Sequence, residues 1–176
     1  KSHIAKLFNY PVFNADLEVA KIYKTNRECF KNLKKKLPKY FSIFPARKED
    51  IIKAVVEDKK NLKKIINIIH PEIKKKMNIF LKQNKKEDVV ILDIPLFLEN
   101  KLYQKEDFIV FIQSSKVEIL KRLRRREKFN LDLLNRFKKL QLPLRYKKKK
   151  SHCIVKNNFT NKSAKISVKK ILKKIL

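Results

Sequence analysis

An apolar run that ends in an acid and a proline constrains the fold of this chain most. Residues 89–92 are Val-Val-Ile-Leu, with no polar residue between them, and Asp93 and Pro95 follow directly. Such a run favours a strand covered on both faces, as in the parallel sheet of an α/β protein. Ligands bind beyond the carboxyl ends of parallel strands, so Asp93 and Pro95 mark the edge of an expected site. The alternative is a core strand that leads into an ordinary loop.

Further strands are predicted around this run. Residues 108–112 form a second continuous apolar stretch, and residues 153–155 form a brief third one. Residues 4–8 have helical spacing, and residues 11–16 predict a short strand ending at Asp16. We interpret this as a βαβ unit without its first strand, whose right-handed crossover would turn Asp16 toward a phosphate loop. Alternatively, Asp16 caps the helix that follows.

A helical lobe is predicted between the strands. Apolar residues recur at helical spacing from Leu17 to Leu37 and from Arg47 to Gln83, and prolines separate the two segments. His70-Pro71 is predicted to end one helix and begin the next, because proline disfavours helix in the residue before it. A lone histidine such as His70 is more often structural than catalytic.

The charge of the chain points toward polyanions. Among 176 residues, 47 are basic and 17 acidic, giving a net charge of +30. A basic nucleic-acid-binding protein is therefore one alternative, although no helix-turn-helix or RNA-binding signature is present and no specific nucleic acid is expected. Lysines make up 39 of the cations and are spread along the whole chain, which equally fits a solvated surface. The length suits one domain.

The remaining composition favours a reducing compartment. Cys29 and Cys153 are the two cysteines, and neither has a neighbour at metal-ligand spacing. No apolar segment approaches the roughly 18 residues of a membrane span. We expect a cytoplasmic protein without a membrane partner. Glycine is absent from the chain, so either a glycine-rich part lies outside these residues or glycine has been removed by an unusual selection or design, and both argue against a glycine loop within them.

Two cationic features suggest phosphate binding. Lys1-Ser2 opens a helix, as does the end of a G-x-x-x-x-G-K-[ST] loop, although two residues alone can be coincidence. The predicted helix from Val117 to Lys128 carries half of the eight arginines, and Arg122 and Arg126 share one face. Arginine suits forked hydrogen bonding to phosphate oxygens. An exposed basic helix without a ligand is the alternative.

Taken in order, these stretches resemble the dephospho-CoA kinase family, the P-loop kinases that complete coenzyme A synthesis. The matching segments are Lys1-Ser2, Asn14-Ala15-Asp16, His70-Pro71, Pro95 to Asn100, Arg122 with Arg126, and Ser151 to Asn157. The first strand and the glycine loop of the family are lacking. Asn14 replaces the first acid of a D-A-D segment, Ser151-His152 replaces an A-D pair, and Phe159 stands where glycine is common.

The resemblance implies a three-layer, P-loop NTPase-like α/β fold. A parallel sheet would carry helices on both faces, with a helical substrate lobe and a helical lid. The implied plan is one domain over 1–176, with a core of 1–16, 86–115 and 151–176, a substrate-binding lobe of 17–85 and a lid-like region of 116–150.

The resemblance also implies an activity, the transfer of the ATP γ-phosphate to the 3′-hydroxyl of dephospho-CoA. Asp16 would accept the hydroxyl proton, Lys1 and Arg122 would assist catalysis, and Ser2 would bind Mg²⁺. ATP would contact Lys1, Ser2, Arg126 and Asn157. Dephospho-CoA would contact Asp16, Arg47, His70, Pro95, Leu96 and Glu99. Alternatives are another small P-loop kinase, such as one for nucleotides or shikimate, and a non-catalytic relative.

Overall fold

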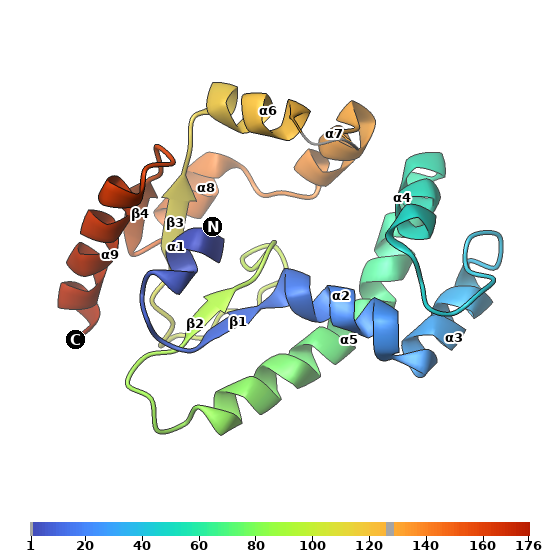
Figure 1. Ribbon diagram of the computed structural model, residues 1–176, viewed down its shortest axis with the longest axis horizontal. Helices are drawn as coiled ribbons and strands as arrows, with labels where there is room; N and C mark the ends of the chain where they lie inside the picture. The colour runs from blue at the N-terminus through green and yellow to red at the C-terminus, as the bar shows by residue number, and fades with distance from the viewer. Residues whose placement is uncertain (1, 126–128) are drawn as a thin grey trace. The chain divides into compact units, whose positions relative to one another are not determined.

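The computed structural model describes residues 2–125 and 129–176, which divide into two compact units (Figure 1). One unit is Phe13–Pro95, and the other joins Lys1–Val12 to Leu96–Leu176. The described elements, in chain order, are α1 (Ser2–Lys6), β1 (Val12–Asn14), α2 (Ala15–Thr25), α3 (Arg27–Lys36), α4 (Lys48–Glu57), α5 (Lys59–Gln83), β2 (Ile91–Asp93), β3 (Val110–Gln113), α6 (Lys116–Arg124), α7 (Leu131–Lys139), α8 (Leu144–Lys149), β4 (Cys153–Lys156) and α9 (Asn161–Ile175).

Strands β1 and β2 form a two-stranded sheet whose carboxyl ends are joined by side chains. Asn14 ends β1 and Asp93 ends β2, and Asn14 Nδ2 donates a hydrogen bond of 3.1 Å to Asp93 Oδ2. Paired strands whose last residues meet in this way run parallel. The apolar run at residues 89–92 therefore contributes a strand to a parallel sheet, as predicted.

Helix α5 forms the centre of the unit Phe13–Pro95, and α2, α3 and α4 pack against it. Figure 1 shows α2 lying across this long helix. Ile65, Ile69, Ile73 and Met77 recur every four residues and are buried, so they form one apolar row along α5. The predicted helical lobe is present, and this row holds it together.

The prediction that a helix ends at His70-Pro71 is wrong. Helix α5 runs without a break from Lys59 to Gln83, and Pro71 lies inside it. Proline removes one backbone hydrogen bond, but the row of buried apolar residues continues on both sides of it, so packing outweighs the local preference. Two unpredicted boundaries lie elsewhere, at Asn26 and Asp58, which each cap the helix that follows.

The other unit is built on the parallel pair β3–β4. Val110 pairs with Cys153, and the register continues to Gln113 opposite Lys156. Helix α9 packs on β4, and its buried residues are Ala164, Val168 and Ile171. Helix α1 packs against α9 in turn. These strands confirm that the fold is of the α/β class, with parallel strands and helices.

Strand burial differs from the expectation. Every residue of β2 and β3 is half-buried rather than buried. Within the described residues, each of these strands is paired with one neighbour, so an edge of each is left open. No helix in the described part of the chain is long and apolar enough to cross a membrane.

Candidate active site

The turn between β1 and α2 is organised by Asn14. Besides its bond to Asp93, its Oδ1 accepts a hydrogen bond of 3.0 Å from the backbone N–H of Leu17, so Asn14 is the N-cap of α2. The alternative that Asp16 caps this helix is therefore wrong. Strand β1 also ends two residues before Asp16, not at it.

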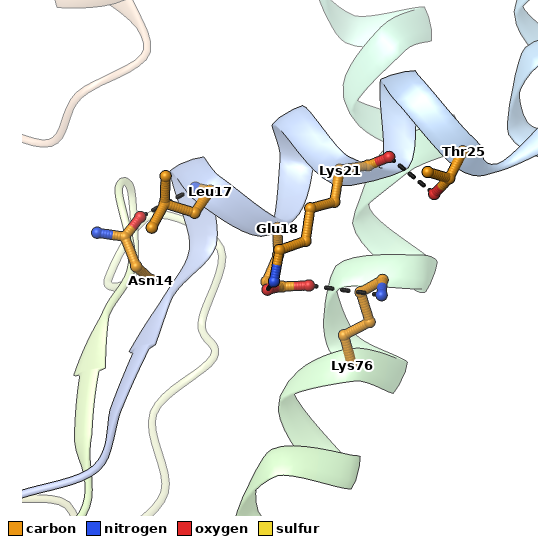
Figure 2. Close-up of polar contacts among 6 residues, drawn as sticks. All are labelled: Asn14, Leu17, Glu18, Lys21, Thr25 and Lys76. Atoms are coloured by element: carbon orange, nitrogen blue, oxygen red, sulfur yellow. Dashed lines mark hydrogen bonds and ion pairs between the residues drawn. The ribbon is translucent and has the colours of Figure 1, made fainter. Parts of the chain in front are cut away.

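Asp16 lies in the first turn of α2, at the carboxyl edge of the β1–β2 sheet, and is exposed. The amino end of a helix stabilises a nearby negative charge, so this position favours a carboxylate. Figure 2 shows the surrounding contacts, in which Glu18 joins α2 to α5. Glu18 accepts from Lys21 at 2.6 Å and lies 3.4 Å from Lys76 Nζ, and these lysines hold the pKa of Glu18 below its usual value. The helix that carries Asp16 is thus fixed to the lobe.

The segment after Pro95 is a compact turn with a strained backbone. Leu96 and Lys101 have φ of 56° and 50°, in the left-handed region that residues with a Cβ rarely occupy. Backbone hydrogen bonds close the turn, from Asn100 N to Leu96 O at 2.9 Å and from Leu102 N to Phe97 O at 3.2 Å. Strained residues of this kind concentrate at functional sites.

Glu99, in the middle of this turn, forms the most enclosed ion pair that we find among the described residues. Its Oε1 lies 2.6 Å from Lys147 Nζ, and the exposed fractions of the two side chains are 9% and 13%. The same oxygen accepts from the Leu142 N–H at 3.0 Å, and Lys147 also donates to Gln141 Oε1 at 3.1 Å. Burial alone would raise the pKa of Glu99, but these donors and the Lys147 charge lower it. The turn is therefore anchored to α8.

A second cluster lies in the loop between β4 and α9. Asn157 Nδ2 donates to Ser114 Oγ at 3.3 Å, and Asn157 Oδ1 accepts from Phe159 N at 3.0 Å. The Arg122 guanidinium lies over the Phe159 ring, with Cζ 4.0 Å from the ring centroid. Glu118 Oε2 is 4.0 Å from Arg122 Nε in an exposed pair. Arg122, a predicted catalytic residue, and Asn157, a predicted ATP-binding residue, thus belong to one loop cluster.

The other predicted site residues are placed as follows. Ser2 opens α1, which is tied to α9 by a 2.7 Å hydrogen bond between His3 Nε2 and Asn161 Oδ1. Lys1 and Arg126 lie outside the described residues. Asp16 belongs to one unit, and Ser2, Arg122 and Asn157 belong to the other. Their meeting around one substrate stays a prediction.

Two predicted substrate residues have contrasting surroundings. Arg47 is the exposed N-cap residue of α4, and its guanidinium donates to Asp50 at 3.1 and 3.3 Å. In contrast, His70 Nε2 is buried and has no hydrogen-bond partner within the described residues. A buried polar atom without a partner is costly, and the substrate role of His70 stays a prediction.

Sequence reasoning missed Lys147 and Ser114. Nothing in the local sequence distinguishes Lys147 from the other lysines. The position of Phe159 did carry a signal, because it departs from a family glycine and has φ of 65°. That angle favours glycine.

Comparisons with known proteins agree on one family. The family model described as dephospho-CoA kinase matches residues 1–163. Dephospho-CoA kinase of Wolbachia sp. subsp. Brugia malayi (strain TRS) is 27% identical over 179 residues, covering 98% of this chain and 90% of that protein. The crystal structure of TT1252 from Thermus thermophilus has a TM-score of 0.75 at 20% identity, covering 99% of this chain and 91% of that one. The dephospho-CoA kinase from Campylobacter jejuni has a TM-score of 0.59 at 23% identity, covering 98% and 88%.

The parallel α/β fold and the family match together define an ATP-dependent kinase. The chain belongs to the dephospho-CoA kinase family. This membership favours the kinase interpretation over the nucleic-acid-binding alternative that the net charge suggested.

Proposed function

We propose that this protein transfers the γ-phosphate of ATP to the 3′-hydroxyl of dephospho-CoA, with Asp16 as general base. The observation that carries the proposal is the position of Asp16. Its carboxylate is exposed in the first turn of α2, at the carboxyl edge of β1–β2, within the residues that match the family model. Open α/β sheets bind ligands at that edge.

Phosphoryl transfer needs positioning and charge neutralisation more than covalent help. Asp16 takes the proton of the attacking hydroxyl, and Lys1 and Arg122 neutralise the charge of the transferring group. Asn157 and Arg126 bind the nucleotide. The Asn157 side chain is already held by Ser114 and by the N–H of Phe159, which supports a preformed nucleotide loop.

The dephospho-CoA contacts are assigned to residues of both units. Asp16, Arg47, His70 and Pro95 belong to one unit, and the Leu96–Glu99 part of the strained turn belongs to the other. The assignment of His70 rests on the resemblance, and its Nε2 is buried without a hydrogen-bond partner among the described residues. The ion pair between Lys147 and Glu99 holds the turn that contains Leu96 and Glu99 in place, which supports their assignment to substrate binding.

Magnesium fits the donor set at the start of α1. The hydroxyl of Ser2 is a hard oxygen ligand of the kind that Mg²⁺ prefers, and Mg²⁺ usually takes one or two protein oxygens together with phosphate oxygens. No cluster of three or more His, Cys, Asp or Glu that could hold a metal occurs in the described ranges 2–125 and 129–176. When bound, the ion would neutralise phosphate charge beside Ser2.

We extend the proposal to the three-layer domain plan, with 17–85 as substrate lobe and 116–150 as lid. Helices α2 to α5 pack together as a lobe would. In the lid-like region, large apolar side chains are exposed, as expected of a surface that closes over substrate: Val117, Ile119, Leu131, Phe137, Leu140 and Leu144. Both cysteines are free, which supports a reducing compartment, and we place the reaction in the cytoplasm.

The test compares Asp16→Asn with Glu28→Gln in the full-length protein, using coupled detection of ADP release with dephospho-CoA. Glu28 is the matched control, because it is also an exposed acid in the first turn of a helix. We expect Asp16→Asn to lower kcat by roughly 10²- to 10⁴-fold, the usual contribution of a general base. Glu28→Gln should leave it unchanged.

Two outcomes would contradict the proposal separately. Wild-type protein that releases no ADP with dephospho-CoA rejects the activity. Wild-type turnover that persists in Asp16→Asn rejects the base assignment alone.

A further inference from the structure

Among the described residues, the Arg122 side chain has one close aromatic partner, the ring of Phe159. The guanidinium carbon lies 4.0 Å from the ring centroid, well within the distance at which a cation is attracted to an aromatic face. Within the part of the chain that the structure describes, Arg122 also lies near Glu118, at 4.0 Å, and both side chains are about half exposed. An exposed ion pair of that length contributes little. Phe159 therefore does most to fix the direction of Arg122.

Phe159 holds this position at a cost to the backbone. Its φ of 65° is in the left-handed region, where a Cβ is unfavourable and glycine is preferred. The loop maintains that conformation through hydrogen bonds from Phe159 N to Asn157 Oδ1 and from Thr160 to Asn158 Oδ1, at 3.0 and 2.9 Å. A bulky residue kept in a strained conformation suggests a use for its side chain.

The same loop also contacts the chain just before α6. Asn157 N donates to Gln113 O at 2.8 Å, and Asn157 Nδ2 donates to Ser114 Oγ at 3.3 Å. Within α6, all of whose residues the structure describes, none is buried. Core packing therefore does little to hold α6. Its start is tied to the loop by Asn157, and its last turn is tied to the same loop by Phe159.

We propose that Phe159 is a positioning residue for Arg122. Its ring holds the guanidinium in one orientation beside the nucleotide loop. The Arg122 side chain therefore loses less conformational entropy when it contacts the phosphoryl group in the transition state. This inference rests on the proposed function, because it assumes that Arg122 neutralises the transferring group.

The test uses three variants of the full-length protein. Phe159→Gly removes the ring and also relieves the backbone strain at positive φ. Phe159→Tyr keeps the aromatic ring and the strained backbone. Phe159→Leu removes the ring but keeps the Cβ. We expect Phe159→Gly and Phe159→Leu to lower kcat by roughly two- to fivefold, the range that an exposed cation–π contact gives, with little change in the KM for dephospho-CoA. Phe159→Tyr should retain wild-type kcat.

Stability separates positioning from a merely structural role. Phe159→Gly should have an unchanged or raised Tm while its kcat falls, because glycine accepts the left-handed conformation without strain. A structural role predicts that Tm and kcat fall together. A second readout is the NMR signal of Arg122 Nε–H, assigned by its disappearance in Arg122→Lys. We expect a ring-current shift in wild type and Phe159→Tyr, and its loss in Phe159→Gly.

Each result bears on one hypothesis. If wild type lacks kinase activity, the proposed function fails, whereas the NMR shift still reports the contact. If wild type is active and Phe159→Gly keeps or increases kcat, the positioning role is overturned. Equal Arg122 shifts in wild type and Phe159→Gly would also overturn it.

Discussion

Replacing Lys147 by methionine tests whether its ion pair with Glu99 anchors the turn after Pro95. Methionine keeps most of the side-chain volume and removes the ammonium group. Glu99, whose side chain is 9% exposed, would keep the Leu142 N–H as a donor but lose the one cation placed 2.6 Å away. Removing one partner of a fully buried pair costs about 3–5 kcal/mol, whereas an exposed pair contributes about 1 kcal/mol or less. This pair is largely but not fully enclosed, so we expect a loss of about 1–3 kcal/mol, which for a chain of this length corresponds to a fall in Tm of roughly 2–12 °C.

The loss should depend on pH. In wild type the folded-state pKa of Glu99 is lowered, so its ionisation contributes stability above the unfolded pKa of about 4.3. That contribution is lost as pH falls through the folded pKa. In Lys147→Met, burial acts without the lysine and favours the protonated carboxyl. The difference in unfolding free energy between wild type and variant should therefore be largest at neutral pH and shrink in acid.

The measurement is urea or thermal unfolding from pH 7 down to about 4, with Lys149→Met as control. Lys149 is an exposed lysine of the same helix, so the substitution is identical but the environment differs. We expect the control to unfold like wild type at each pH. A Lys147→Met variant as stable as wild type at pH 7, or one whose loss is the same at every pH, would refute the argument.

Two further predictions concern the Phe13–Pro95 unit. Asn14→Ala removes the cap on the Leu17 N–H and the donor to Asp93, so we expect the free energy of unfolding to fall by about 1–2 kcal/mol in urea titrations; no change would show that both bonds are dispensable. Pro71→Ala restores a backbone N–H inside α5, and we expect the free energy of unfolding to rise by about 1–2 kcal/mol. Proline inside a helix destabilises the folded state by more than it stabilises the protein through restricting the unfolded chain. A lower Tm for Pro71→Ala would mean that packing along α5 requires the proline geometry.

The parts of the fold that could be predicted are those set by local patterns. The strand at residues 89–92 and the helical lobe follow from apolar periodicity, which reports burial directly. The short strand before Asp16 also follows from its apolar residues, although it ends at Asn14 rather than at Asp16. These features depend on residues that are close in sequence.

The parts that could not be predicted depend on contacts between distant segments. Lys147 is one of 39 lysines, and it pairs with Glu99 because the tertiary structure brings the two side chains together. The continuation of α5 through Pro71 likewise depends on α2, α3 and α4 covering its apolar row. A local rule about proline gives way when enough buried area lies on both sides of it.

Asn14 shows how a departure from the family pattern acquires a physical reason once the structure is known. In sequence it replaces the first acid of a D-A-D segment. In the structure its side-chain amide makes two hydrogen bonds. Nδ2 donates to Asp93, and Oδ1 accepts from the N–H of Leu17. An ionised aspartate could accept from Leu17 but could not donate to Asp93, and it would bring two negative charges together. The choice at position 14 is therefore coupled to the acid that ends the neighbouring strand, and Asp16 is left as the exposed carboxylate at that edge.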